Sequence, residues 1–256
     1  LLAKVGFFAS GNIYFRNRYF ADVSYRTSGS SAYGKENRFA PMWSFGLGWN
    51  LHKEKFLENV EWIDVIRLKW SWGYNGQTTG SPYQAITTYK YSNSNIYYTG
   101  VGTVPIRMGN PELKWQRVLK NNFGINLTLF KERLVMSFDY FRTQFFHAVV
   151  VDQEYDPETI RVYGSSGPSW TDTYQIDFSW SPVERLDLFA TFRYTDSEMT
   201  IRRSDGRSVQ VERPLVSRYK TLLNIQYATK FRRWVFDATA QLNGPARIPT
   251  QTGDLA

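Results

Sequence analysis

Residues 42–51 read MWSFGLGWNL, and their side chains alternate in size and polarity. The odd positions carry large apolar residues, and the even positions carry mostly small or polar ones. Because a β-strand sends successive side chains to opposite faces, this pattern predicts a strand with one apolar and one polar face. The apolar face either packs into the core of a soluble β-sandwich or contacts lipid.

The same alternation recurs along the whole chain. It is clear in residues 62–75, 122–130, 186–194 and 234–243, and a further strand is expected over about 3–15. About ten such segments occur, each close to the ~9–11 residues that a tilted membrane-crossing strand needs. No segment keeps a helical period, so the chain is predicted to be all-β.

Short and long connections alternate strictly between these strands. The short turns are 16–18, 131–133, 182–185 and 229–233, together with a moderate connection at 52–61. The long polar segments are 27–41, 76–114, 146–172 and 197–217. An up-and-down antiparallel barrel of the outer membrane has short turns on one rim and long loops on the other, whereas a Greek-key sandwich does not.

Composition supports a membrane barrel over a soluble domain. Of the 256 residues, 17% are aromatic, yet the mean hydropathy is negative, at -0.44. Outer-membrane barrels combine aromatic girdles with a polar interior. The net charge of +8 comes from dispersed Lys and Arg, so no nucleic-acid partner is expected. The absence of Cys excludes disulfides and thiolate metal sites.

Nothing in the sequence marks a catalytic, metal or cofactor site. The two histidines, His52 and His147, are expected on opposite rims of the barrel, where they cannot share a site. The acidic loop sequence EYDPE at 154–158 departs from an EF-hand pattern and is predicted to be a solvated loop. We therefore predict no enzymatic activity.

The period of two also assigns side chains to the faces of the barrel. The predicted lipid-facing side chains are Trp43, Phe45, Leu47, Trp49, Trp70, Trp72 and Phe236. The predicted lumen-facing side chains are Arg26, Arg67, Lys69, Asn126, Asp139, Asp177 and Arg193. Gly46 and Gly48 fall on the lumen side, where they either leave room for a plug or solute or only allow curvature.

The long segment 81–98 is rich in tyrosine. Aromatic rings next to amide and hydroxyl groups suit sugar or peptide contacts, although a loop without a ligand is equally compatible with the pattern. The candidate ligand-binding side chains are Tyr83, Tyr89, Tyr91, Tyr97 and Tyr98.

Residues 10–144 resemble one known family. RTSGSS at 26–31, GYNG at 73–76 and NPELKW at 110–115 are similar to the barrel of TonB-dependent outer-membrane transporters of the starch-utilisation (SusC-like) branch. Residues 147–250, with RPL at 213–215 and RIP at 247–249, instead resemble the branch that takes up metal chelates such as ferric siderophores. The resemblance changes near 143–150, which fits either a divergent member or a composite sequence.

The resemblance implies a fold and a function. Members have a plug domain, an N-terminal TonB-contacting box and a barrel of about 22 strands. We therefore expect residues 1–256 to be one partial outer-membrane barrel domain without its plug. The implied activity is TonB-dependent import of a bulky glycan, peptide or metal chelate. The implied partners are membrane lipid, the TonB complex and a SusD-like surface lipoprotein, and no cofactor is implied. A passive porin and a soluble carbohydrate-binding β-sandwich are the alternatives.

Overall fold

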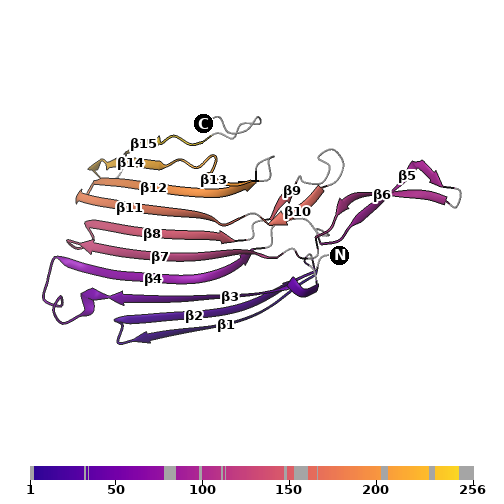
Figure 1. The fold of residues 1–256 in the computed structure, drawn as a ribbon. Coiled ribbons are helices and arrows are strands. Elements are labelled where there is room, and N and C mark those ends of the chain that lie inside the picture. Colours follow the sequence, from indigo (N-terminus) through magenta and orange to yellow (C-terminus); the bar gives the residue numbers. More distant parts are fainter. Residues whose placement is uncertain are drawn as a thin grey trace.

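Ten strands form one continuous antiparallel meander in the computed structural model (Figure 1). The described residues are 3–31, 33, 35–77, 85–97, 100–110, 112, 114–146, 149–152, 161–165, 167–202, 207–230 and 234–247. The ten strands are β1 (Lys4–Phe15), β2 (Tyr19–Ser30), β3 (Phe39–Asn50), β4 (Ile63–Gln77), β7 (Gln116–Leu129), β8 (Leu134–Phe146), β11 (Ser169–Val183), β12 (Leu186–Arg202), β14 (Tyr219–Ala228) and β15 (Val235–Asn243). They pair in chain order, as an up-and-down barrel requires.

Five further strands lie within the long connections. β13 (Ser208–Glu212) extends the sheet beside the end of β12. A separate sheet has the order β5-β6-β10-β9 and joins two long connections, because β6 and β10 pair across them. Its strands are β5 (Thr88–Tyr97), β6 (Gly100–Met108), β9 (Val149–Asp152) and β10 (Arg161–Ser165). Two 3-10 turns, Lys35–Asn37 and Leu51–Lys53, are the only helical elements in the described ranges, and neither could cross a membrane.

The predicted alternation of connections is confirmed. Figure 1 shows the short turns at the left end of the sheet and the small loop sheet at the right end. The β1–β2 turn has positive φ at Arg16 and Asn17, 52° and 56°, and Arg18 N–H donates to the Phe15 carbonyl oxygen at 3.0 Å. These are the features of a type I′ hairpin, whose twist matches that of the flanking strands. We call this end of the sheet the short-turn rim.

Several strands run further toward the long connections than the alternation indicated. β2 and β3 remain paired up to Gly29 opposite Phe39, inside the predicted loop 27–41. β12 likewise continues to Arg202 and pairs with β13 inside the predicted loop 197–217. Residues 27–31 (TSGSS) are small or polar on both faces, so they carry no period of two. Backbone hydrogen bonds alone extend the ladder here, and the hydropathy pattern of the sequence does not indicate such bonds.

Asp64, which interrupts the alternation of β4, lies at an irregularity in the ladder. The β4–β7 register shifts between Ile63 and Val65, as at a β-bulge. The Asp64 carboxylate then accepts a hydrogen bond from the Glu132 backbone N–H at 3.0 Å. The bulge therefore allows a charged residue to satisfy the neighbouring turn without placing it in the apolar row.

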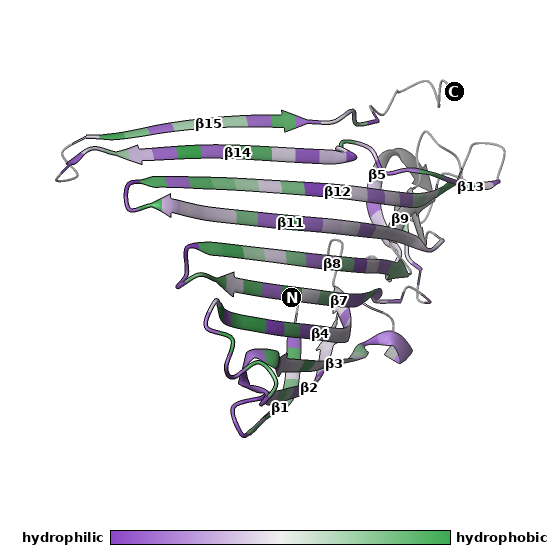
Figure 2. Ribbon diagram, turned by 90° about the vertical axis from the view of Figure 1, so that its left-hand side faces the viewer, coloured by the Kyte–Doolittle hydropathy of each residue, from purple (hydrophilic) through white to green (hydrophobic). Residues whose placement is uncertain are grey.

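The apolar face of the main sheet is uncovered. Figure 2 shows green and purple bands alternating along β11, β12, β14 and β15. Only four hydrophobic residues in the described part of the chain are buried, namely Tyr33, Ala40, Trp115 and Val118. The chain exposes 18218 Å², whereas a soluble globular chain of 29.9 kDa exposes roughly 11,700 Å². The fold is therefore a partial barrel wall, and the β-sandwich alternative is wrong.

Glu54 ties two connections together at the short-turn rim. Its carboxylate accepts hydrogen bonds from the Tyr19 hydroxyl at 2.7 Å and the Trp49 indole N–H at 3.1 Å. It also pairs with the Arg18 guanidinium at 3.2 Å. These contacts lower the pKa of Glu54, with the hydrogen bonds from Tyr19 and Trp49 as the main causes. The carboxylate thus holds the β1–β2 turn against the β3–β4 connection.

Replacing Glu54 by alanine is expected to lower the apparent melting temperature of the full-length protein at neutral pH. A group with a lowered folded pKa stabilises the fold above its ordinary pKa, here 4.5, and loses that effect as the pH falls through its folded value. The difference in melting temperature between wild type and Glu54→Ala should therefore shrink below about pH 4.5. Thermal denaturation in detergent from pH 7 to pH 3 measures it. A difference that stays constant with pH would contradict the role of the ionised carboxylate.

Candidate functional site

All seven side chains predicted to face the lumen share one face of the main sheet. One row of cross-strand pairs runs from Arg67 through Asn126 and Ser137 to Asp177. The next row runs from Lys69 through Gly124, Asp139 and Gln175 to Arg193. Arg26 has the same parity on β2, further toward the long connections. Directly paired residues of antiparallel strands point to the same side, so these groups form one polar face.

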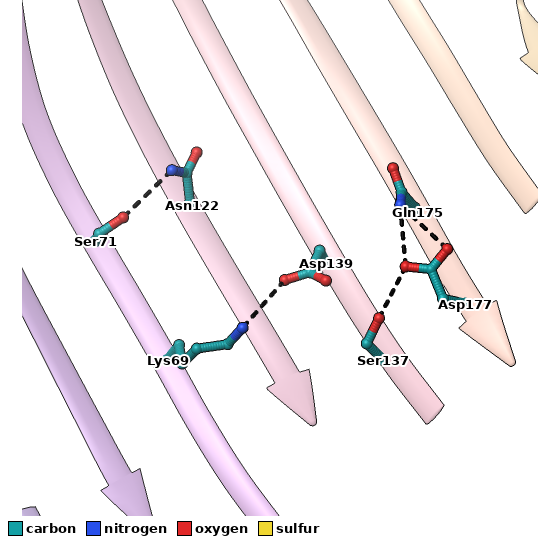
Figure 3. Close-up of polar contacts among 7 residues, drawn as sticks. All are labelled: Lys69, Ser71, Asn122, Ser137, Asp139, Gln175 and Asp177. Carbon is teal, nitrogen blue, oxygen red and sulfur yellow. Dashed lines mark hydrogen bonds and ion pairs between the residues drawn. The ribbon is translucent and has the colours of Figure 1, made fainter. Parts of the chain in front are cut away.

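The polar face carries a hydrogen-bond network that crosses several strands (Figure 3). The Asp177 carboxylate accepts hydrogen bonds from Ser137 Oγ at 3.0 Å, Gln175 Nε2 at 3.0 and 3.2 Å, and Thr191 Oγ1 at 2.8 Å. The Asn122 amide donates to Ser71 Oγ at 3.3 Å. These contacts connect β4 to β7 and β8 through β11 to β12. Such satisfied networks fix side-chain orientations and hold neighbouring strands in register.

Lys69 and Asp139 meet across the strand between them. Lys69 Nζ lies 3.9 Å from Asp139 Oδ1, and the intervening position on β7 is Gly124. A Cβ added at Gly124 would contact the Asp139 carboxylate and lie 3.2 Å from Lys69 Cε. The absence of a side chain at Gly124 thus leaves the space in which a lysine and an aspartate two strands apart pair.

Neighbouring side chains fill the space above Gly46 and Gly48. A Cβ at Gly46 would meet the Asp22 carboxylate, and a Cβ at Gly48 would meet the Phe20 ring. Phe20 in turn lies under the Arg67 guanidinium, whose carbon is 5.8 Å from the ring centroid. The room that these glycines leave is therefore occupied by residues of β2.

The seven side chains predicted to face lipid share the opposite face. Trp43, Phe45, Leu47 and Trp49 pair with residues of β4 on the same face, including Trp70 and Trp72. Aromatic rings contact edge to face, with centroids 4.6 Å apart for Trp43 and Trp72 and 6.0 Å for Phe45 and Trp70. Phe236 has the same parity on β15 and is 61% exposed. The face is apolar over most of its length, and toward the long connections it also carries a polar row with Arg142 and Asp172.

A hollow of about 660 Å³ lies on the polar face toward the long connections. Arg26, Ser24, Asn75, Lys120 and Thr143 line it, together with the apolar groups of Met42, Val118 and Phe145. A second hollow of about 340 Å³ adjoins it, since Arg26, Met42 and Gly76 line both. The second hollow adds Lys4 and Trp115. We call the two together the rim hollow.

The tyrosines of the long segment fall partly outside the described residues. Tyr89 and Tyr91 lie on β5 and are 62% and 81% exposed. Tyr83 and Tyr98 lie outside the described residues, as does the side chain of Tyr97. Nothing in the structure brings Tyr89 or Tyr91 to the polar face, so their role remains a prediction.

The other candidate groups give no second site. His52 Nδ1 lies 3.2 Å from the Ile66 carbonyl oxygen at the short-turn rim, where it contributes to the turn. His147 and residues 154–158 lie outside the described residues. Among the side chains that the structure describes, no three His, Asp or Glu lie close enough together to hold a metal ion.

A family model described as TonB dependent receptor-like, beta-barrel matches residues 3–254. The chain belongs to this family. The TonB-dependent receptor barrel is an integral outer-membrane fold, so this chain is a segment of an outer-membrane protein. The sequence motifs predicted this family correctly.

Two curated relatives are similar to this receptor barrel. TonB-dependent receptor P39 of Formosa agariphila is 27% identical over 190 residues, covering 72% of this chain and 18% of the relative. TonB-dependent receptor SusC of Bacteroides thetaiotaomicron is 30% identical over 144 residues, covering 54% of this chain and 14% of the relative. The chain thus spans less than a fifth of the length of either relative.

Solved structures share the fold at low sequence identity. The RagAB peptide importer in its closed-closed state has a TM-score of 0.75 at 18% identity, covering 94% of this chain and 33% of the solved one. A variant of the ferric enterobactin receptor PfeA of Pseudomonas aeruginosa has a TM-score of 0.63 at 14% identity, covering 95% and 33%. Both likenesses concern the barrel wall.

Sequence reasoning missed three features of this receptor barrel. They are the Glu54 contacts, the packing of Phe20 over Gly48, and the rim hollow with Lys4 and Lys120. The parity of Lys120 on its strand could have indicated the last of these. The Glu54 contacts and the Phe20 packing join residues of different strands or connections, and no local sequence pattern indicates such contacts.

Proposed function

We propose that this chain is part of the wall of a TonB-dependent transporter that actively imports a bulky polar nutrient across the outer membrane. The observation that carries the proposal is the continuous polar face, with its network around Asp177, on a sheet of this family. A polar lumen allows a hydrated solute or a plug to contact the wall without losing hydrogen bonds. The apolar face would then contact lipid and carry aromatic residues at the membrane interfaces.

We propose that the nutrient is a glycan or a peptide. SusC is among the curated relatives, and the RagAB peptide importer has a higher TM-score than the PfeA variant, 0.75 against 0.63. The exposed rings of Tyr89 and Tyr91 would suit stacking on a sugar or a peptide plane. A metal chelate is the second candidate, supported by the resemblance of residues 147–250 and by the siderophore-receptor likeness. The polar side chains of the wall would position solute and have no catalytic role.

The proposed partners follow from the same branch. The TonB complex would supply energy through a segment outside this chain, and a SusD-like surface lipoprotein would cap the rim with the long loops. Lipid would cover the apolar face, and no nucleic acid or cofactor is expected. We further propose that residues 1–256 form one barrel unit, because β8 and β11 pair over twelve positions on either side of the predicted change near 143–150.

The proposal predicts that uptake needs TonB. A strain that lacks the full-length gene should lose growth on at least one glycan or peptide supplied at limiting concentration as sole carbon source. Deleting tonB should abolish the same growth, and a plasmid copy of the gene should restore it only when tonB is present. Growth on glucose is the control.

A passive porin would give a different result. Growth restored by the gene without tonB, or a steady open conductance of the purified protein in planar bilayers, would overturn the active-transport proposal. A phenotype restricted to iron limitation would instead favour import of a metal chelate.

A further inference from the structure

The rim hollow is basic. Among the residues that the structure describes, its charged lining residues are Lys4, Arg26 and Lys120, and no Asp or Glu lines either part of it. All three belong to the polar face, since Lys4 pairs with Ser30 on β2 and Lys120 pairs with Gly73 on β4. Asp22 on β2 pairs with Gly46 on β3 and marks a level on this face. Between that level and the long connections, the face carries no acidic residue on the described parts of β1 to β4, β7, β8, β11 and β12. The carboxylates in this region point the other way.

The cations of the hollow lack carboxylate partners among the described residues, whereas two nearby cations have them. Deeper on the same face Lys69 pairs with Asp139, and on the opposite face Arg142 pairs with Asp172 at 3.7 Å. Within the described ranges, no ion pair involves Lys4, Arg26 or Lys120. Like charges placed together without compensation raise the local positive potential and attract anions. The three cations therefore favour the binding of an anionic group in the hollow.

Arg26 is oriented to receive an anion. Its Nε donates to Ser28 Oγ at 3.0 Å, which fixes the guanidinium and leaves its terminal N–H groups for a ligand. A guanidinium held in this way matches the two oxygens of a carboxylate. Ser24, Asn75 and Thr143 add neutral hydrogen-bonding groups, and Phe145 adds aromatic surface.

The edge of the hollow is firmly packed. Trp115 stacks on Tyr33 with centroids 5.1 Å apart and donates from its indole N–H to the Arg38 carbonyl oxygen at 3.2 Å. Both rings are buried, and Met42 packs against them. This cluster is the one buried apolar core in the described structure, and it borders the hollow through Trp115 and Met42. A rigid edge reduces the entropy cost of holding a ligand.

We propose that the rim hollow binds a carboxylate group of the imported nutrient, with Arg26 as its main contact and Lys120 as its second. The inference rests on the proposed function, because it makes the hollow a contact of the imported nutrient in the lumen. The carboxylate would belong either to a uronic acid of an oligosaccharide or to an acidic peptide. The site selects acidic over neutral nutrients of the same size.

Binding to the purified full-length protein in detergent tests the proposal without TonB. The probes are tetragalacturonate, tetraglutamate and neutral maltotetraose, measured by isothermal titration calorimetry at 50 mM and 300 mM NaCl. We expect one acidic probe to bind at least about tenfold more tightly than maltotetraose at low salt and to weaken at high salt. The acidic probe that binds identifies the source of the carboxylate.

Variants locate the binding. Arg26→Gln and Lys120→Gln should each lower the affinity for the acidic probe about tenfold, since each removes a charge-assisted hydrogen bond. Lys131→Gln, at an exposed lysine of the short-turn rim, should leave affinity unchanged. Lys120→Arg keeps the charge and should retain binding, which separates loss of charge from misfolding. The proposal is overturned if neither acidic probe binds more tightly than maltotetraose, or if Arg26→Gln and Lys120→Gln behave like Lys131→Gln. TonB-dependent growth would stand in either case.

Discussion

An arginine in place of Leu223 is expected to destabilise the barrel by about 2–4 kcal/mol, as a cation does at the midplane of a bilayer-facing strand. Leu223 lies halfway along β14 on the apolar face, between Tyr219 and Tyr227, and is 50% exposed. Its paired neighbours are Ala190 and Ala240, which offer the guanidinium no partner. The folded fraction of the full-length protein, measured by heat-modifiable mobility on gels, should fall, and guanidinium unfolding should shift to lower concentration.

The matched control lies three residues away on the same strand. Gln226 is on the polar face, paired with Asp187 on one side and Asp237 on the other. Gln226→Arg places the same cation between two carboxylates, so its folded fraction should equal that of wild type or exceed it. Equal damage from both substitutions would show that the apolar face does not contact lipid.

Replacing Gly48 by valine is expected to cost about 1–3 kcal/mol, because the added side chain overpacks a filled site. Gly48 is buried, and its Cβ would fall on the Phe20 ring. That ring must then leave its place beneath Arg67, which loses the cation–π contact as well. The unfolding midpoint of the full-length protein in guanidinium, followed by tryptophan fluorescence, measures the effect.

Two further variants separate overpacking from a general intolerance of valine. Within the described residues, a Cβ added at Gly11 on β1 would meet no atom within 4 Å beyond its chain neighbours, so Gly11→Val should leave the midpoint unchanged or raise it. Phe20→Ala should partly rescue Gly48→Val, since it clears the space that the valine needs. If the two substitutions are additive, the Phe20 contact does not explain the glycine.

The sequence alone predicted the barrel wall, its order of strands and the two faces. These features depend on a period of two, which is local, and on solvents that differ on the two sides of each strand. The same reasoning did not predict where the strands end. Where both sides are polar, as at residues 27–31, pairing continues without any hydropathy signal. It also grouped Arg67, Lys69 and Asp139 on one face without indicating which of them meet.

Only the tertiary structure decided those contacts. Lys69 reaches Asp139 because the register sets Gly124 between them, and Glu54 meets Tyr19 across 35 positions of sequence. The rim hollow likewise needs β1, β2 and β7 to bring Lys4, Arg26 and Lys120 to one end of the polar face. Register is fixed by hydrogen bonds between strands, and those bonds join residues that no local pattern connects. The sequence therefore determines which side of the wall each residue faces, and strand pairing determines which residue it meets there.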